Sequence, residues 1–350
     1  MRLDYSKAVF GLQINGTAFA DTVYGGQGND TIFGGGGRDI IYAKAGNDTI
    51  YTGNGGTLVR CGTGNDKVFG GYGNDKIYAD YGHNYINTGD GNDTVYGGSG
   101  NDTIIGGAGT NKLHTGLGNN FVCGGTGNDY IYGSNNGNDT ILGGSGNDLI
   151  YGYNGSDEIY TGAGNNKVYA GGGGDTVVAG SGDNIIYGEG GADELWSGVG
   201  GTDKLYGGSS NDILVGGTLG DNFLEGGTDS DTYVFDFNAP MTSSADGDQG
   251  AYVADIGQNY IYDCSGSADS IVFAGLDQSD VRYEQSGRYD LMITFEGVDG
   301  FVFVKNHFRG CNRIEDIAFG DDVPENPLEF PQPDLSVVGQ CEIQDPGLLI

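Results

Sequence analysis

A nine-residue unit repeated in tandem limits the folds open to this chain more than any other feature. The clearest copy is Gly97 to Ile105, GGSGNDTII, and the same register returns at Gly25 to Phe33, Gly124 to Tyr132 and Gly143 to Tyr151. Variants of the unit fill the sequence from Gly16 to Phe235. Such a short unit buries its apolar residue only by stacking on other copies, so the repeats predict a solenoid.

Each repeat divides into a loop and a very short strand. The first five positions are rich in glycine, which accepts the tight, positive-φ backbone that other residues resist. The seventh to ninth positions read polar, aliphatic and then mostly Tyr or Phe, which is the period-2 pattern of a strand with one buried face. The eighth position hardly varies from Ile32 to Leu224, and we expect it to form the core.

The sixth position is usually aspartate. A carboxylate at the end of a loop whose carbonyls point inward completes an all-oxygen nest suited to a hard cation such as Ca²⁺. The predicted metal ligands are Asp21, Asp30, Asp39, Asp48, Asp66, Asp75, Asp93, Asp102, Asp129, Asp139, Asp148, Asp157, Asp175, Asp193, Asp203, Asp212 and Asp231.

Seven repeats lack this acid. Thr57, Asn84, Asn111, Asn120, Asn166, Asn184 and Asn222 stand in its place. An amide keeps a carbonyl oxygen but not the charge, so we expect weaker or empty sites there. The asparagine common at the fifth position is expected to be a loop residue that tolerates the left-handed conformation, rather than a ligand.

The charge of the chain supports a metal. The formal net charge is −33, which by itself predicts a self-repelling chain and argues against nucleic acid or an anionic membrane as partner. One divalent ion for each sixth-position aspartate would bring roughly 34 positive charges and nearly cancel the excess. Calcium binding and folding are therefore expected to be one event.

The repeats resemble the RTX, or haemolysin-type, calcium-binding nonapeptide over roughly two thirds of the chain. The resemblance implies an all-β fold, a right-handed parallel β-roll in which two successive repeats make one turn. Ca²⁺ would lie along both edges, held by carbonyls and by the sixth-position Asp of one unit and of the unit two further on. It also implies secretion through a type I channel and folding outside the cell.

The chain is expected to have four parts. Residues 1–15 form an N-terminal segment that we expect to cap the first turn, and residues 16–235 form the β-roll, with single-residue insertions at Gly133 to Leu142, Ser197 to Tyr206 and Gly216 to Glu225. Residues 236–321 are expected to be a β-rich C-terminal cap, although Ala268 to Phe273 echoes the repeat. Residues 322–350 read as a tail, where a type I secretion signal would lie. The cap strands are expected at 260–263, 270–274, 281–284, 291–295, 300–304 and 314–319.

Conventional targeting and cross-linking signals are sparse. Residues 1–15 lack the apolar core of a signal peptide, and no apolar run is long enough for a membrane span. Cys61 and Cys123 lie too many repeats apart to form a disulfide with each other. Among Cys264, Cys311 and Cys341 one bridge is allowed, which leaves an odd thiol.

Catalytic signatures are also missing from the sequence. His83, His114 and His307 sit in separate segments without zinc-ligand spacing, and neither a nucleophile elbow nor a phosphate-binding loop occurs. We therefore expect no enzyme, but an extracellular or cell-surface protein with a structural or adhesive role.

The ninth-position aromatics leave an alternative open. They are expected to form solvent-facing ladders, read either as cross-strand packing or as a surface for polysaccharide or for self-association. The alternative function is thus a polysaccharide-binding accessory module for a separate enzyme. The column comprises Tyr24, Phe33, Tyr42, Tyr51, Phe69, Tyr78, Tyr96, Tyr132, Tyr151, Tyr160, Tyr169, Tyr187, Trp196 and Tyr206. Ice binding, which RTX solenoids also support, is disfavoured because the third-position column is ragged.

Overall fold

The computed structural model describes residues 1–217, 220–237, 254–262, 265, 266, 268–296, 298–305, 307 and 314–319. These residues fall into two compact units, the first ending at Ala163 and the second beginning at Gly164. Each described unit is all-β apart from one 3₁₀ turn, Gln278–Asp280. Within these ranges no helix has the length and hydropathy needed to cross a membrane.

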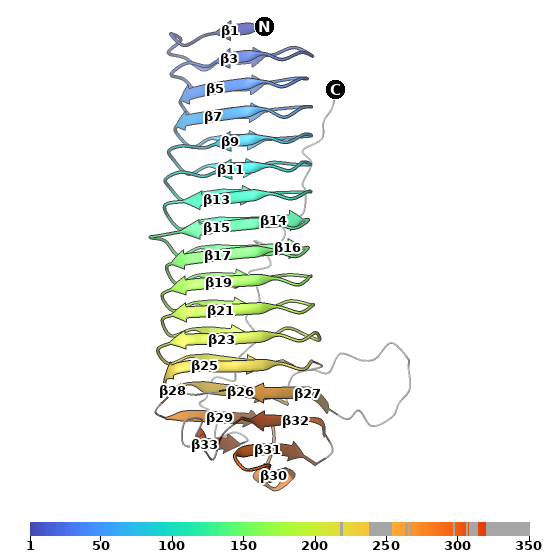
Figure 1. Cartoon of the computed structure of the whole chain (residues 1–350). Coiled ribbons are helices and arrows are strands. Elements are labelled where there is room, and N and C mark those ends of the chain that lie inside the picture. Colours follow the sequence, from blue (N-terminus) through green and yellow to red (C-terminus); the bar gives the residue numbers. More distant parts are fainter. Residues whose placement is uncertain are drawn as a thin grey trace. The chain divides into compact units, whose positions relative to one another are not determined.

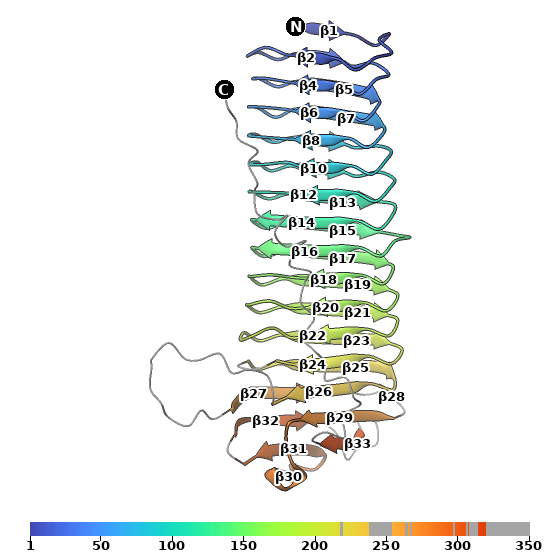
Figure 2. The same cartoon turned by 180° about the vertical axis from the view of Figure 1, so that it is seen from behind.

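The first unit is a solenoid of two parallel sheets. Successive strands alternate between two sheets, which we call the odd sheet and the even sheet. The odd sheet faces the viewer in Figure 1, and the even sheet faces the viewer in Figure 2, where the molecule is turned by 180°. The odd sheet contains β1 (Arg2–Asp4), β3 (Thr22–Tyr24), β5 (Ile40–Ala45), β7 (Leu58–Thr63), β9 (Lys76–Tyr78), β11 (Thr94–Tyr96), β13 (Lys112–Gly116), β15 (Tyr130–Ser134) and β17 (Leu149–Asn154). The even sheet contains β2 (Gln13–Asn15), β4 (Thr31–Phe33), β6 (Thr49–Tyr51), β8 (Lys67–Phe69), β10 (Tyr85–Asn87), β12 (Thr103–Ile105), β14 (Phe121–Thr126), β16 (Thr140–Ser145) and β18 (Glu158–Tyr160).

The second unit repeats this arrangement. Its odd sheet contains the parallel strands β19 (Lys167–Gly172), β21 (Ile185–Gly190), β23 (Lys204–Ser209), β25 (Phe223–Asp229), β27 (Ala254–Ile261), β28 (Ser265–Gly266) and β32 (Val298–Val304). Its even sheet contains β20 (Thr176–Val178), β22 (Glu194–Trp196), β24 (Ile213–Gly216), β26 (Thr232–Asp236), β29 (Asp269–Ala274) and β33 (Ile314–Phe319). Among the strands that the structure describes, β31 (Asp290–Phe295) alone pairs antiparallel with two neighbours, β30 (Val281–Ser286) on one side and β32 on the other. The predicted parallel solenoid is therefore confirmed.

Both ends of the repeat array continue into strands outside it. In the first unit β1 and β2 add one strand to each sheet before residue 16. In the second unit β29 continues the even sheet in parallel register after β26. The strands expected between 260 and 319 are present, whereas the tail at 322–350 lies outside the described residues.

The core is built on the column of eighth-position side chains in each sheet, joined by buried first-position residues such as Ala43 and Cys61. Val68, Ile86 and Ile104 stack in direct register and are fully buried. The single-residue insertions leave this register intact: Asn120 pairs with Asp139, 19 residues on, instead of the usual 18. A loop takes up the extra residue because the strands are held by the ladder on either side.

Candidate metal sites

The sixth-position residues form hydrogen-bonded ladders along the loops. The backbone N–H of Asp30 donates to Oδ1 of Asp48 at 2.7 Å, and Asp48 in turn donates to Asp66 at 2.7 Å. The other edge of the first unit has the same pattern, in which Asp21 donates to Asp39 at 2.8 Å. All seventeen predicted ligands are between 0% and 3% exposed. The structure therefore lines these acids up inside the loops, as the sequence predicted.

The carboxylate oxygen that takes no part in the ladder, Oδ2, makes these residues candidate metal ligands. Oδ2 is buried and accepts no hydrogen bond in Asp39, Asp48, Asp66, Asp102, Asp129, Asp193 and Asp212. A buried carboxylate oxygen without a partner costs far more free energy than a neutral polar atom in the same place. A positive charge beside each of these oxygens would remove that cost.

A first-position glycine lets a carboxylate oxygen and a carbonyl oxygen converge close to its Cα. A carbon atom added to Cα of Gly97 would lie 2.7 Å from Oδ2 of Asp102 and 2.1 Å from the carbonyl oxygen of Thr115, the first residue of the next loop on that edge. We call this space the nest. Equivalent nests adjoin Gly25, Gly34, Gly70, Gly124, Gly133, Gly143, Gly188 and Gly207, where the same two oxygens lie 2.0–2.6 Å (carbonyl) and 2.3–3.0 Å (Oδ2) from that point.

The donor set fits a hard cation. No cluster of three or more His, Cys, Asp or Glu side chains that could hold a metal occurs within the described ranges. A metal bound here must therefore use main-chain carbonyls besides carboxylates, and Ca²⁺ prefers such oxygen ligands at about 2.3–2.6 Å. Ca²⁺ would neutralise the acids and cross-link successive loops of one edge.

Burial without a cation changes the protonation of these acids. It raises the pKa of Asp48 to about 6, of Asp66 and Asp129 to about 7, and of Asp193 to about 8. Desolvation is the largest cause in each case, and neighbouring acids raise the pKa further at all four. Burial thus favours the neutral acid, and a divalent ion would favour the carboxylate.

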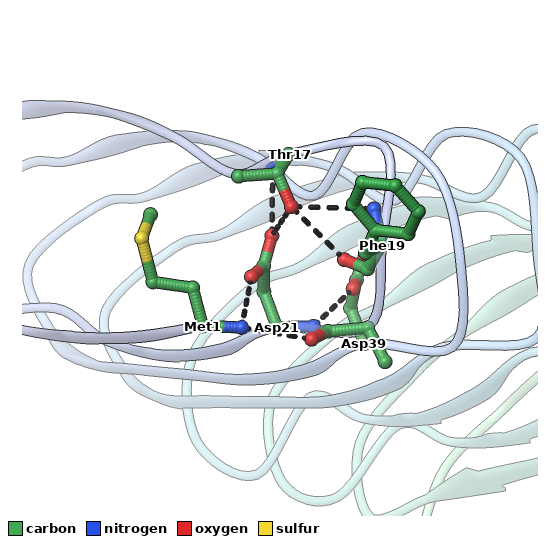
Figure 3. A network of polar contacts seen from close by, with 6 residues as sticks. Met1, Thr17, Phe19, Asp21 and Asp39 are labelled. Carbon is green, nitrogen blue, oxygen red and sulfur yellow. Dashed lines mark hydrogen bonds and ion pairs between the residues drawn. The ribbon is translucent and has the colours of Figure 1, made fainter.

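Asp21 shows the effect of a nearby positive charge. The α-amino group of Met1 lies 2.5 Å from its Oδ1, while the amide and hydroxyl of Thr17 donate to Oδ2 at 2.6 and 2.8 Å (Figure 3). The hydrogen bond from the Met1 amino group is the main reason why the pKa of Asp21 is lowered. Here the ammonium group stands at Oδ1, the oxygen that accepts a ladder N–H in other repeats such as Asp48.

Besides Asp21, four of the predicted ligands use Oδ2 within the hydrogen-bond network. Oδ2 of Asp30, Asp139 and Asp203 accepts a backbone N–H of its own loop, from Gly26, Ser134 and Gly198 respectively. Oδ2 of Asp75 lies 3.0 Å from the hydroxyl of Thr52. A cation at these four would compete with an existing hydrogen bond.

Asparagine at the sixth position maintains the ladder. Oδ1 of Asn120 accepts the N–H of Asp102 at 2.9 Å, and its Nδ2 donates to the carbonyl of Gly118 at 2.9 Å. The amide oxygen of Asn120 thus takes the ladder bond, and an N–H donor stands where aspartate has its second oxygen. That a cation binds weakly in such loops stays a prediction.

The fifth-position asparagines differ from the expectation. None of them has a positive φ; in the loops positive φ falls chiefly on the second and fourth positions, as at Gly35 (98°) and Gly37 (94°). Instead, Oδ1 of Asn47 accepts the N–H of Asn65 at 2.8 Å, and Asn65 repeats this with His83. The expected left-handed role was wrong, because a side-chain ladder between loops satisfies the exposed N–H groups.

One ladder residue escaped the sequence analysis. Asp269 is 2% exposed, and its Oδ1 accepts the N–H of Asp231 at 3.0 Å. The echo of the repeat at Ala268 to Phe273 could have identified it, but the 38 residues that separate it from Asp231 hid its register.

The aromatic ladders are tighter than expected. Tyr78, Tyr96, His114, Tyr132 and Tyr151 stack with ring centroids 4.4–5.5 Å apart and with nearly parallel planes. Each inner ring is covered on both faces, which favours the cross-strand packing interpretation.

The expectation that every ninth-position aromatic faces solvent was wrong at two places. Tyr160 and Trp196 are 7% and 5% exposed. Each ring donates a hydrogen bond to the glutamate two residues earlier on the same strand face, Glu158 and Glu194 respectively. Those bonds hold the rings close to their own strands.

The cysteines agree with the expected separation of Cys61 from Cys123. Cys61 is a free and buried thiol, and Cys123 is disulfide-bonded. The bridge expected among Cys264, Cys311 and Cys341 lies outside the described residues.

Comparison with known families agrees with this geometry. The RTX calcium-binding nonapeptide repeat family matches residues 15–50, 33–56, 62–95, 87–122, 96–131, 124–136, 133–168, 169–201 and 198–218. The chain belongs to this family of calcium-binding repeats. The nests of this RTX protein are thus built from the repeat that gives the family its name. No curated protein sequence matches the chain significantly.

Several solved structures resemble this RTX protein. One of them is the X-ray crystal structure of a hyperactive, Ca²⁺-dependent, beta-helical antifreeze protein from an Antarctic bacterium. The two share 21% sequence identity over 75% of this chain and 77% of that chain, with a TM-score of 0.36. A similarity at this level carries no inference about function.

Proposed function

We propose that this RTX protein is a secreted, non-enzymatic scaffold that folds when it binds Ca²⁺ outside the cell and serves a structural or adhesive role. The observation that carries the proposal is the nest: a buried Oδ2 without a hydrogen-bond partner beside a first-position glycine, as at Asp102 and Gly97. Repetition of this nest along both edges makes Ca²⁺ part of the fold rather than of one catalytic centre.

Secretion is supported by the coupling between metal and folding. A chain with a net charge of −33 remains expanded until its acids are neutralised. Such a chain could pass a type I channel unfolded where free Ca²⁺ is scarce and fold where Ca²⁺ is abundant. The type I route itself comes from the family resemblance.

The absence of catalysis is supported by the use of the acids. A general acid or base needs a carboxylate free to exchange a proton with substrate, whereas Oδ1 of Asp129 and Asp193 accepts a ladder N–H and Oδ2 faces the nest. Turnover of a polysaccharide by the purified, calcium-loaded protein would overturn this part of the proposal.

Calcium titration tests the main proposal. Chelator-treated protein should show little strand signal in far-ultraviolet circular dichroism, and added Ca²⁺ should restore the signal cooperatively. Mg²⁺ is the matched control, because it demands a smaller octahedral site and dehydrates reluctantly. Strand content that persists in chelator at neutral pH, with an unchanged melting temperature, would contradict the proposal.

Polysaccharide binding is the second candidate, and two exposed rings favour it. Tyr72 and Tyr81 are third-position residues of adjacent repeats on opposite edges and are 64% and 63% exposed. Their faces are available for stacking on a sugar, unlike those of Tyr96 and Tyr132 inside the ladder. A glycan pull-down should lose binding in Tyr72→Ala and Tyr81→Ala, while Tyr96→Ala, a ladder variant, should keep it. Binding that is lost only in the ladder variant would contradict this assignment, and no binding by the native protein would favour the scaffold role.

A further inference from the structure

The first residue of a repeat determines whether its nest is open. Glycine occupies this position in most repeats, but Thr52 and Thr88 occupy it in two repeats of the same edge, 36 residues apart. Both side chains are almost completely buried, at 1% and 0% exposure. A buried hydroxyl needs a hydrogen-bond partner. The atom to which each threonine donates therefore indicates whether the hydroxyl takes the place of a cation.

Each threonine hydroxyl donates to the oxygen that lines a nest in the glycine repeats. Oγ1 of Thr88 donates to the carbonyl of Gly106 at 2.6 Å, and Oγ1 of Thr52 donates to the carbonyl of Gly70. Gly70 and Gly106 are the first residues of the next loop on that edge. Thr115 supplies the same first-position carbonyl to the open nest of Gly97.

Thr52 also reaches a carboxylate. Its Oγ1 lies 3.0 Å from Oδ2 of Asp75, in the next loop. One hydroxyl therefore faces a carbonyl and a carboxylate oxygen, although this carboxylate belongs to the next loop, because the sixth residue of the Thr52 repeat is Thr57.

We propose that Thr52 and Thr88 plug two nests of this edge. In these two repeats the threonine hydroxyl donates a hydrogen bond to the first-position carbonyl oxygen, whereas in the glycine repeats a Ca²⁺ ion binds that oxygen. The β-carbon occupies the point on which the oxygens converge, and the hydroxyl supplies the donor. The proposal rests on Ca²⁺ binding in the open nests.

The plug changes the set of ligands expected from acids alone. Asp93 is the sixth residue of the repeat that begins with Thr88, and it is 1% exposed. An aspartate at the sixth position predicts a bound ion, whereas the first-position threonine predicts none. At Thr52 and at Thr88, a hydrogen bond from the threonine hydroxyl would thus join its loop to the next loop of the same edge without a metal ion.

Ion counting by native mass spectrometry tests the plug. Thr88→Gly should bind one more Ca²⁺ than the native chain, because it opens a nest beside Asp93. The reverse variant, Gly97→Thr, should bind one fewer, because it fills the nest of Asp102. Gly97 lacks a positive φ, so its backbone dihedral angles suit a threonine, but the carbonyl of Thr115 must shift to make room for the β-carbon.

Thr115→Gly is the matched control. Thr115 is a buried first-position threonine, but its own sixth residue is Asn120, so its removal should leave the ion count unchanged. Thr88→Ser keeps the hydroxyl and should also leave the count unchanged. Circular dichroism in Ca²⁺ checks that each variant folds; if Thr88→Gly does not fold, Gly97→Thr decides.

The outcomes separate the two proposals. A native chain that binds no Ca²⁺ would overturn the proposed function. A native chain that binds Ca²⁺, with unchanged counts in folded Thr88→Gly and Gly97→Thr, would overturn the plug alone.

Discussion

The backbone N–H of Asn84 donates to Oδ1 of Asp102 at 2.8 Å, although Asn84 itself is an amide where most repeats carry the acid. This one bond joins two loops 18 residues apart and uses only half of the Asp102 carboxylate. The ladder therefore aligns the loops without metal, and Oδ2 of Asp102 is left for a cation. The two functions of one side chain can be separated by substitution.

Asp102→Asn should retain the ladder bond and lose the charge that binds Ca²⁺. We expect one ion fewer per chain and a higher calcium midpoint for folding. The stability lost should reach about 2.7 kcal/mol at a free Ca²⁺ concentration about 100 times the Kd of that site. Urea unfolding in Ca²⁺ measures it. Asp90→Asn, an exposed third-position variant with the same charge change, is the control and should show almost no loss; equal losses would contradict the assignment of Asp102.

Stability in chelator should fall as pH rises. The folded-state pKa values of Asp66 and Asp193, about 7 and about 8, lie above the ordinary value of 3.8. Below 3.8 both states are protonated, so the folded chain keeps its full stability; above it the unfolded chain ionises first, and stability is lost as pH rises to about 8. Melting temperatures in chelator from about pH 4 to about pH 8 measure this.

Calcium should reverse the sign of that pH dependence. Ca²⁺ binds the ionised carboxylates, so acidification should release ions and lower the melting temperature of the loaded protein. High salt is the control, since it screens general repulsion between surface charges but affects buried acids much less. A chelated protein that melts at a higher temperature at about pH 8 than at about pH 5 would refute the explanation.

Ile86→Ala should destabilise the calcium-loaded protein by about 2–5 kcal/mol, because it opens a cavity in a single-residue core column. Ile86 is fully buried between Val68 and Ile104. Ile40→Ala, at a partly exposed seventh position, should cost much less. Urea unfolding in Ca²⁺ compares the two, and equal losses would show that the column is not the main source of stability.

Asn47→Ala should cost about 0.5–1.5 kcal/mol, because it removes the acceptor for the N–H of Asn65. Asn54→Ala, at an exposed third position, is the control. Hydrogen exchange at the Asn65 amide gives a local measurement and should accelerate only in Asn47→Ala. No change in that exchange would show that the fifth-position ladder contributes little.

The nine-residue period by itself determined the solenoid, the two series of acids and the core. The physical reason is local. Glycine determines the conformation of the loop, and the alternation of apolar and polar residues around Ile86 or Ile104 determines which side of the strand is buried. The period also located the insertion before Asp139, because the residues on either side of it keep their register.

Only the tertiary structure decided which contacts form between residues about 18 positions apart. It showed that Asn47 bonds to the next loop, that Tyr96 and Tyr132 cover both faces of His114, and that Asp269 extends the ladder from Asp231. It also showed that the hydroxyl of Thr88 donates to the carbonyl of Gly106, the counterpart on its edge of the Thr115 carbonyl beside Gly97. These contacts depend on how stacked loops face each other in space, and a sequence pattern gives the order of the loops but not the distances between their atoms.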